Sequence, residues 1–272
     1  MRKLVAVLSF TALLLASPAW AQLAAPNAAG VSMGHLHFAV QDVDAAKAFW
    51  TAMGGTPLAK RGANEQLKFP GVLVLIRKGE PSGGTVGSVI NHIGFLVPNV
   101  QQAVARWKAA GLNVEPGTRP QQAYVTTPDG LVRIEILEDA AQSAPIVFQH
   151  VHFYLSAPDS GSGDQIAAIQ AWYAKMFGAR PGKRGPFEAA DVPGVNLSFT
   201  KSDTPVVGTK GRALDHIGFE IKNLEVFCKK AEANGVKFDM PYTKRPELGI
   251  ALAFITDPWG TYIELNEGLD RL

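Results

Sequence analysis

Four similar segments hold all six histidines of the sequence. They are HLHFAV from His35, HIGFLV from His92, HVHFYL from His150 and HIGFEI from His216. Each is short, apolar and rich in β-branched and aromatic residues, a composition typical of a strand. Because side chains alternate along a strand, the two histidines of HLHFAV share one face, and so do those of HVHFYL. Imidazoles gathered in this way could bind a divalent metal, although a single histidine in a strand is more often a hydrogen-bonded core residue.

Two glutamates stand in matching places of two later segments. Glu135 lies in TTPDGLVRIEI and Glu264 in TDPWGTYIEL. One more residue separates the turn glycine from the glutamate in the first segment, so we expect Glu135 to be displaced or its strand to bulge. Arg133 and Tyr262 precede these glutamates by two residues and share their faces. An arginine there could hold an anionic substrate and a tyrosine could exchange a proton, or both could lie only at the rim of a cavity.

The elements that carry these residues repeat four times. After each histidine segment, apolar residues recur at helical spacing and a glycine follows. The expected helices cover 43–53, 100–107, 166–176 and 224–231. Alternating apolar stretches broken by Pro and Gly come next, most clearly at 72–77, 131–137, 195–200 and 262–265. The sequence therefore predicts an α+β protein built from four βαβββ modules.

The modules match in alternation, which indicates a tandem duplication. PGVLVLIRK in module one resembles PGVNLSFTK in module three, and the glutamate segments of modules two and four resemble each other. We expect two domains, at 32–138 and 149–268, each a curved mixed sheet that forms a cleft with helices outside. Between them, Ala, Gln, Ser and Pro interrupt the periodicity.

The first 21 residues, MRKLVAVLSFTALLLASPAWA, have the pattern of a secretory signal peptide: a basic start, a short apolar stretch and a small-residue cleavage site after Ala21. We therefore expect a periplasmic or secreted protein. Because the signal holds two basic and no acidic residues, the mature chain carries equal numbers of both. This balance argues against nucleic-acid partners and a polybasic membrane surface, and no later segment is long and apolar enough to span a membrane.

These features resemble the vicinal oxygen chelate superfamily, which includes glyoxalase I, extradiol dioxygenases and bleomycin-resistance proteins. The resemblance covers residues 32–267, and HLHFAVQDVDAAKAFW, TPDGLVRIEI and DPWGTYIEL are its most specific parts. It implies that the ligands of a divalent metal (Fe, Mn, Ni or Zn) are the first histidine of each opening strand and the glutamate of each closing strand. The implied triads are His35, His92, Glu135 in the first domain and His150, His216, Glu264 in the second.

Two histidines and one carboxylate leave coordination positions open and suit Fe(II). Either one triad or both could bind metal, and the shorter spacing before Glu264 favours the second domain. Glyoxalase-like members usually add a glutamate from the first closing strand, but segments 72–78 and 195–201 contain no acidic residue. This absence favours a three-ligand, dioxygenase-type site. Extradiol dioxygenases in turn need an acid–base histidine, which is missing here unless His37 or His152 serves.

Five other residues are expected around the site. Tyr124 stands where extradiol dioxygenases place a tyrosine, and Asn196 and Ser198 are polar where the first domain has leucines. With Arg133, these residues are candidates for contacts with substrate, and Tyr262 is the candidate for proton transfer.

The sequence thus predicts an exported, metal-dependent enzyme, a monomer or homodimer, that acts on a small molecule through bidentate oxygen chelation. Glyoxalase-like lyase or isomerase chemistry is favoured because it needs fewer absent residues. The alternatives are an extradiol ring-cleaving dioxygenase and a non-catalytic binding or resistance protein.

Overall fold

The computed structural model describes residues 23–156 and 164–271. The predicted signal peptide, residues 1–21, lies outside the described residues. No helix within the described ranges is long and apolar enough to cross a membrane.

Within the described ranges, each of the four α-helices follows a histidine-bearing strand, as the repeat predicts. They are α1 (Val43–Met53), α2 (Val100–Ala109), α3 (Gln165–Phe177) and α4 (Leu224–Ala233). Local chemistry sets several of their ends. The Asp42 carboxylate accepts a hydrogen bond from the first turn of α1, and Asn99 does the same for α2. Gly54 and Gly178 end α1 and α3 in the left-handed conformation that glycine adopts without strain.

The strands form two eight-stranded mixed sheets. The first sheet has the order β14 (Met240–Arg245), β15 (Ile250–Thr256), β16 (Tyr262–Glu267), β13 (Leu214–Ile221), β1 (Val31–Val40), β4 (Val72–Lys78), β3 (Asn64–Phe69), β2 (Thr56–Arg61). The second sheet has the order β10 (Arg180–Arg184), β11 (Phe187–Val192), β12 (Val195–Lys201), β9 (Val147–Leu155), β5 (Ile90–Val97), β8 (Arg133–Glu138), β7 (Gln122–Thr126), β6 (Asn113–Pro116). The predicted fold class, α+β with four βαβββ modules in two curved sheets, is confirmed.

The pairing of the modules differs from the expectation. Module one shares its sheet with module four through the antiparallel pair β1–β13, and module two shares its sheet with module three through β5–β9. The expectation that consecutive modules, within 32–138 and within 149–268, build one sheet each is therefore wrong. The chain leaves the first sheet through residues 79–89 and returns through 202–213. These two crossovers lie together, with Ser82 N donating to Gly211 O and Ala213 N to Gly83 O.

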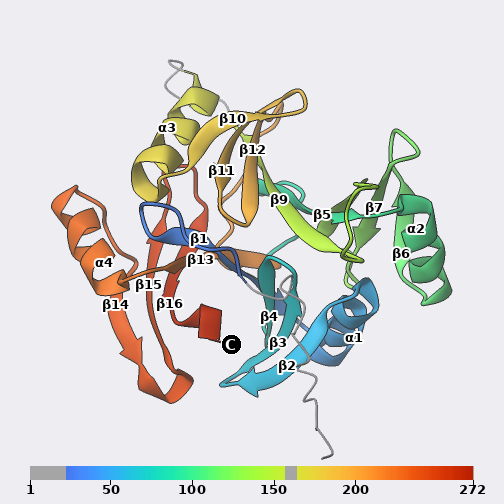
Figure 1. The fold of residues 1–272 in the computed structure, drawn as a ribbon, viewed down its shortest axis with the longest axis horizontal. Helices are drawn as coiled ribbons and strands as arrows, with labels where there is room; N and C mark the ends of the chain where they lie inside the picture. Colours follow the sequence, from blue (N-terminus) through green and yellow to red (C-terminus); the bar gives the residue numbers. More distant parts are fainter. Residues whose placement is uncertain (1–22, 157–163, 272) are drawn as a thin grey trace, which may run out of the picture.

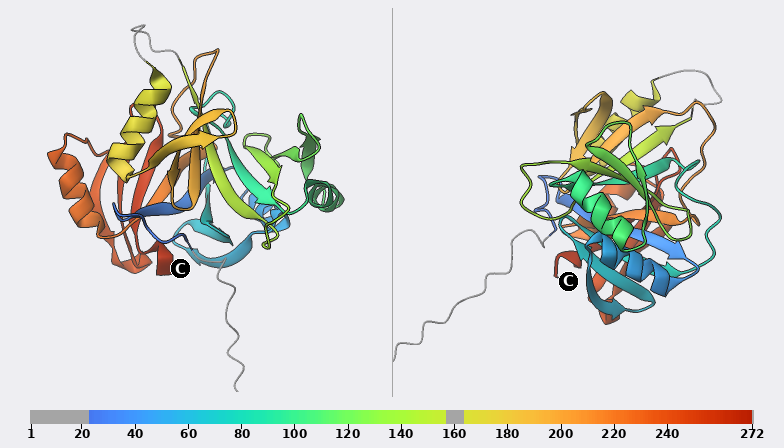
Figure 2. Two further views of the ribbon diagram at one scale, coloured as in Figure 1. Left: turned by 45° about the horizontal axis from the view of Figure 1, so that its top comes forward. Right: turned by 90° about the vertical axis from the view of Figure 1, so that its right-hand side faces the viewer.

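Each sheet has a helix-covered face and a concave face. Figures 1 and 2 show the helices on the outside of the two curved sheets. Alternation along β1 directs Leu36 and Phe38 into the core, where Phe38 packs on Trp50 of α1. His35 and His37 therefore face the concave side. The opening strands place their histidines in the middle of each sheet, where both modules of the pair meet.

Candidate metal centres

The histidines gather into two clusters, one on the concave face of each sheet. Centre A comprises His35, His37, His216 and Glu264, and centre B comprises His92, His150, His152 and Glu135. All six predicted ligands thus lie in a centre, but the predicted triads are wrong in their grouping. His35 joins His216 and Glu264, while His150 joins His92 and Glu135. The reason is the sheet pairing, which brings modules one and four together and modules two and three together.

In centre A, the two opening strands point imidazole nitrogens at one carboxylate oxygen. Glu264 Oε2 lies 3.2 Å from His35 Nε2 and 2.9 Å from His216 Nε2. The other carboxylate oxygen accepts a hydrogen bond of 2.7 Å from Asn266 Nδ2. On the far side of its ring, His216 Nδ1 donates to Asp215 Oδ1 at 2.6 Å. This second contact fixes the ring and leaves Nε2 directed at the centre, an arrangement common among metal-binding histidines.

The protonation states of centre A follow from burial and these contacts. Burial lowers the pKa of His35 and lowers that of His37 strongly. Burial also acts to lower the pKa of His216, but the carboxylates of Asp215 and Glu264 outweigh it and raise that pKa. Although burial acts to raise the pKa of Glu264, its contacts with His216 and His35 hold that pKa well below the usual range. Centre A therefore contains an ionised carboxylate among closely spaced imidazoles.

Centre B repeats this geometry with different neighbours. Glu135 Oε2 lies 3.1 Å from His150 Nε2 and 3.5 Å from His92 Nε2. His92 Nδ1 lies 2.9 Å from Asn91 Oδ1, and His150 Nδ1 lies 2.6 Å from Gln149 Oε1. These amide oxygens accept the Nδ1 protons, so both Nε2 atoms present lone pairs to the centre.

Burial is the main influence on the imidazoles of centre B. It lowers the pKa of His92, that of His150 to about 3 and that of His152 to about 2. Burial acts to raise the pKa of Glu135, but hydrogen bonds with His150 and His92 bring it far below the ordinary value. At neutral pH the centre thus offers neutral imidazoles and a carboxylate, the protonation states in which these groups bind metals.

Glycines on the opening strands make room for one imidazole in each centre. A Cβ at Gly94 would overlap the ring of His150, with even the distant Nε2 only 2.6 Å away. A Cβ at Gly218 would overlap the ring of His35 in the same way, 2.7 Å from its Nε2. Gly94 pairs with Glu135 and Gly218 pairs with Glu264. The two glutamates hold the same register, so the expected displacement of Glu135 is wrong; its strand simply begins after the longer turn.

The same register identifies the place of the fourth ligand in glyoxalase-like sites. The positions symmetric to Glu264 and Glu135 are those that pair with His37 and His152, and they hold Leu75 and Ser198. Among the described residues, each centre therefore has a single carboxylate directed at the Nε2 atoms of its histidines, in agreement with the sequence. Each centre also has a third histidine, His37 or His152. The symmetric strands β13 and β5 have Gly218 and Gly94 at these positions. His152 lies with Nδ1 3.3 Å from His92 Nε2 and Nε2 2.8 Å from Thr200 Oγ1.

The C-terminal segment packs on the leucines that pair with the histidines of β1. Leu269, in a short 3-10 helix (Leu269–Arg271), packs with Leu73 and Leu75 in a small buried apolar cluster. The carboxylate of Glu220 accepts hydrogen bonds from Gly268 N and Leu269 N at 2.7 and 3.1 Å. Figure 1 shows this end of the chain inside the curve of the first sheet. Apolar side chains therefore lie beside centre A, where Leu73 and Leu75 pair with His35 and His37.

Polar side chains surround centre B instead. Tyr124 OH donates to Glu135 Oε1 at 3.4 Å, and Gln122 Nε2 donates to the same oxygen. The guanidinium of Arg133 stacks on the Tyr124 ring, 3.9 Å from its centroid. The structure thus brings the predicted Tyr124 and Arg133 to centre B, in partly exposed positions suited to substrate contact.

Asn196 and Ser198 also lie at centre B, where they support an arginine that sequence reasoning missed. Arg184 Nε donates to Ser198 Oγ at 2.7 Å, and Ser198 Oγ donates to Asn196 Oδ1 at 2.7 Å. Arg184 Nη1 comes within 3.9 Å of Glu135 Oε2. The available signal was the repeated Lys-Arg-Gly of the turns at 60–62 and 183–185.

Tyr262, the predicted proton-transfer residue, lies at centre A. Its ring stacks on Phe254 at 4.8 Å and meets the His216 ring edge-on at 5.7 Å. Burial raises its pKa to about 12. The hydroxyl is therefore a proton donor or hydrogen-bond partner at neutral pH, and its catalytic role stays a prediction.

The donor sets of both centres fit a divalent ion. Ligand atoms from His35, His37, His216 and Glu264 lie within 4.8 Å of one another, as do those from His92, His150 and His152. His35 Nε2, His150 Nε2 and Glu135 Oε2 are buried, and their contacts of 3.1–3.2 Å with Glu264 Oε2 and with each other lack the alignment of good hydrogen bonds among the described residues. Unpaired buried donors and acceptors are costly, and a bound ion would satisfy them.

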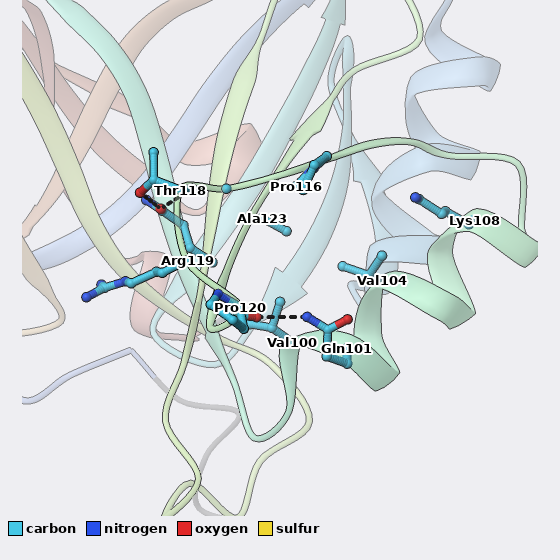
Figure 3. A pocket seen from close by; sticks show the side chains of 11 residues that line it. Val100, Gln101, Val104, Lys108, Pro116, Thr118, Arg119, Pro120 and Ala123 are labelled. Atoms are coloured by element: carbon cyan, nitrogen blue, oxygen red, sulfur yellow. Dashed lines mark hydrogen bonds between the residues drawn. The ribbon is translucent and has the colours of Figure 1, made fainter.

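A surface pocket of about 360 Å³ lies between α2 and residues 116–123, and one of its lining residues, Gln122, donates to Glu135 of centre B (Figure 3). Its lining includes Val104, Lys108 and Pro116 but none of the clustered histidines. It carries no group suited to metal binding.

Comparisons with known proteins agree with this architecture. The model of the Glyoxalase/Bleomycin resistance protein/Dioxygenase superfamily matches residues 162–265. Glyoxalase I from Zea mays is similar in structure, with a TM-score of 0.67 and 19% identity over 89% of this chain and 94% of that chain. A putative dioxygenase from Bacillus subtilis subsp. subtilis str. 168 gives a TM-score of 0.63 and 14% identity over 91% of this chain and 86% of that chain. No curated protein matches the sequence.

The resemblance to the vicinal oxygen chelate superfamily is thereby confirmed. The sequence match covers the modules of residues 162–265, and the structural similarity extends the fold to both sheets.

Proposed function

We propose that the protein is a divalent-metal-dependent enzyme of the dioxygenase type, and that centre B carries out its chemistry on a small molecule with two adjacent oxygens. One observation carries this proposal: two histidines and a single carboxylate converge at centre B, with Ser198 where a glyoxalase-like site has its second glutamate. Two histidines and one carboxylate are the donor set of non-haem Fe(II) oxygenases. This reverses the preference drawn from the sequence alone.

Bound at His92, His150 and Glu135, the metal would supply Lewis acidity and coordination positions for two substrate oxygens. The side chains around the metal would orient its ligands and the substrate. Asn91 and Gln149 hold the imidazoles in the metal-binding orientation. Centre B has polar, partly exposed neighbours in Tyr124 and Arg133, whereas Leu269 packs on Leu73 and Leu75 beside centre A.

His152 answers the objection that a dioxygenase lacks an acid–base histidine. The Thr200 hydroxyl holds its Nε2, and its Nδ1 faces the centre beside His92. Burial lowers its pKa and keeps the ring neutral, and Nδ1, which lies 3.3 Å from His92 Nε2, is the atom that we propose takes a proton from a substrate hydroxyl. Tyr124, which contacts Glu135, would place a second hydroxyl beside the substrate.

A glyoxalase-like isomerase is the second candidate, because the overall fold matches glyoxalase I from Zea mays. We also propose that the protein is exported, on the signal-peptide pattern of residues 1–21. Cell fractionation with N-terminal sequencing tests the export; recovery in the cytoplasm with residues 1–21 attached would refute it.

The activity test uses the mature protein reconstituted anaerobically with Fe(II), Mn(II), Ni(II) or Zn(II). Oxygen uptake with a panel of catechols is measured beside isomerisation of the hemithioacetals of 2-oxoaldehydes. We expect oxygen uptake with Fe(II) or Mn(II), its loss in His152→Ala with metal content retained, and its survival in His37→Ala, the matched change in centre A.

Three outcomes would contradict the proposal. Isomerase activity without oxygen uptake would assign the second candidate. Absence of bound metal would indicate a binding protein. Equal activity of His152→Ala and the unmodified protein would remove the acid–base role.

A further inference from the structure

The two Lys-Arg-Gly turns place equivalent arginines at equivalent points of the two sheets, yet the arginines point in different directions. Arg61 and Arg184 end β2 and β10, the edge strands that follow α1 and α3. Arg61 Nη1 donates to the Leu248 carbonyl at 2.8 Å, so its guanidinium bridges to the opposite edge of the first sheet. Arg184 instead turns into the second sheet and reaches centre B.

The difference arises from the closing strands. In the first sheet, Leu73 and Leu75 offer no acceptor to an inward-turning arginine. In the second, Asn196 and Ser198 occupy the matching places, paired with His150 and His152 as the leucines are paired with His35 and His37. A chain of hydrogen bonds leads away from the guanidinium: Arg184 donates to Ser198 Oγ, and Ser198 Oγ donates to Asn196 Oδ1. Asn196 Nδ2 in turn donates to Asp191 Oδ1 at 2.7 Å.

The inward guanidinium has hydrogen-bonding capacity left over. Only 16% of the Arg184 side chain is exposed, and its Nη2 is buried with no hydrogen-bond partner among the described residues. Its only nearby carboxylate is Glu135, 3.9 Å from Nη1, within the part of the chain that the structure describes. Since Glu135 is also a candidate metal ligand, a bound cation would compete for its negative charge.

The electrostatic environment of centre B is cationic. The positive charges of Arg133 and Arg184 both act on His92, and that of Arg119 acts on Arg184. A buried cation without a full partner is costly, and this cost favours a ligand that brings a negative charge. Because a guanidinium presents two parallel N–H groups, a carboxylate is the anion that fits it best among small organic groups.

We infer that centre B takes an anionic substrate, with a carboxylate next to its two chelating oxygens that binds the free edge of Arg184. Because Nη1 lies 3.9 Å from Glu135 Oε2, the carboxylate should adjoin the chelating oxygen pair, as an ortho substituent does. This inference rests on the proposed function, since it requires a chelated substrate at centre B. Ser198 acts through Arg184 as a positioning residue.

The test measures ligand binding to the Co(II) protein by calorimetry and by the visible spectrum. A His35→Ala background removes a ligand of centre A, so that the spectrum reports on centre B. The probes are 2,3-dihydroxybenzoate, whose carboxylate adjoins the oxygen pair, 3,4-dihydroxybenzoate, whose carboxylate is remote, and catechol, which has none. The variants are Arg184→Met, Arg184→Lys and Ser198→Leu, with Arg61→Met as the matched control in the other sheet.

We expect 2,3-dihydroxybenzoate to bind at least tenfold more tightly than catechol, and Arg184→Met to abolish that preference while catechol affinity changes less than twofold. Arg184→Lys should restore part of the preference and Ser198→Leu should reduce it. Arg61→Met should leave it intact. Equal binding of the three probes, or an unchanged preference in Arg184→Met, would overturn the inference although Co(II) binds. Failure of Co(II) to bind centre B would instead refute the proposed function and the inference with it.

Discussion

Substitution of Gly94 by alanine is a test of centre B that leaves every candidate ligand in the sequence. The new Cβ would lie 2.6 Å from His150 Nε2 and closer still to other ring atoms, whereas non-bonded carbons rest at about 3.5–4.0 Å. The ring must therefore move by about 1 Å or more, and metal–ligand distances tolerate only about 0.2 Å. The backbone at Gly94 is not among the left-handed positions, so alanine causes the effect through this overlap alone.

We expect Gly94→Ala to weaken metal binding at centre B by about tenfold to a hundredfold. This is the range seen when a residue that orients a metal ligand is lost. That change corresponds to about 1.4–2.7 kcal/mol. Overpacking should also lower the free energy of unfolding by about 1–3 kcal/mol. Competitive Co(II) titration measures the first quantity, and denaturant unfolding of the metal-free protein measures the second.

Two matched variants sharpen the test. Gly218→Ala should weaken the metal of centre A instead, because its Cβ would overlap His35. Gly182→Ala should leave the metal affinity of both centres unchanged, because a Cβ there meets nothing within 4 Å. Wild-type metal affinity at centre B in a folded Gly94→Ala protein would refute the assignment of His150 as a ligand.

Further predictions concern stability and its dependence on pH and metal. Leu269→Ala should lower the free energy of unfolding by about 2–3 kcal/mol, since Leu269 is buried against Leu73 and Leu75, and should speed Co(II) uptake at centre A in stopped-flow traces. An unchanged uptake rate would show that this segment does not limit access. Burial raises the pKa of Asp257 to about 6 despite a hydrogen bond from the Tyr173 hydroxyl, so the folded state keeps a proton that the unfolded state loses near pH 4. Its contribution to stability is therefore present below about pH 4 and lost as the pH rises through 6, by about 2–3 kcal/mol. Asp257→Asn should flatten this part of the stability curve; an identical pH profile would contradict the argument. Removal of metal with a chelator should lower Tm, by the equivalent of about 2.7 kcal/mol when the metal had been present at a hundred times its Kd; an unchanged Tm would count against a metal in either centre.

The sequence was sufficient for the local structure and for the set of candidate ligands. Strand and helix periodicities reflect which face of each element is buried, and this is a property of neighbouring residues. The repeat then showed that the histidines and both glutamates occupy equivalent strands. All six predicted ligands do face a concave surface. The positions at which a glyoxalase-like site would have its second glutamate hold Leu75 and Ser198.

Only the tertiary structure decided which modules pair and hence which ligands meet. The four opening strands have nearly the same apolar pattern, so each could pair with any of the others, and local periodicity does not distinguish a partner 60 residues away from one 180 residues away. The chain in fact crosses between the sheets at 79–89 and 202–213, which joins His35 to His216 and His92 to His150. The direction of Arg184 depends likewise on a contact across strands, the hydroxyl of Ser198, and two identical Lys-Arg-Gly turns therefore place their arginines differently. Burial is encoded along the chain, whereas partner choice is settled by contacts between distant segments, and the metal centres of this protein are made from such contacts.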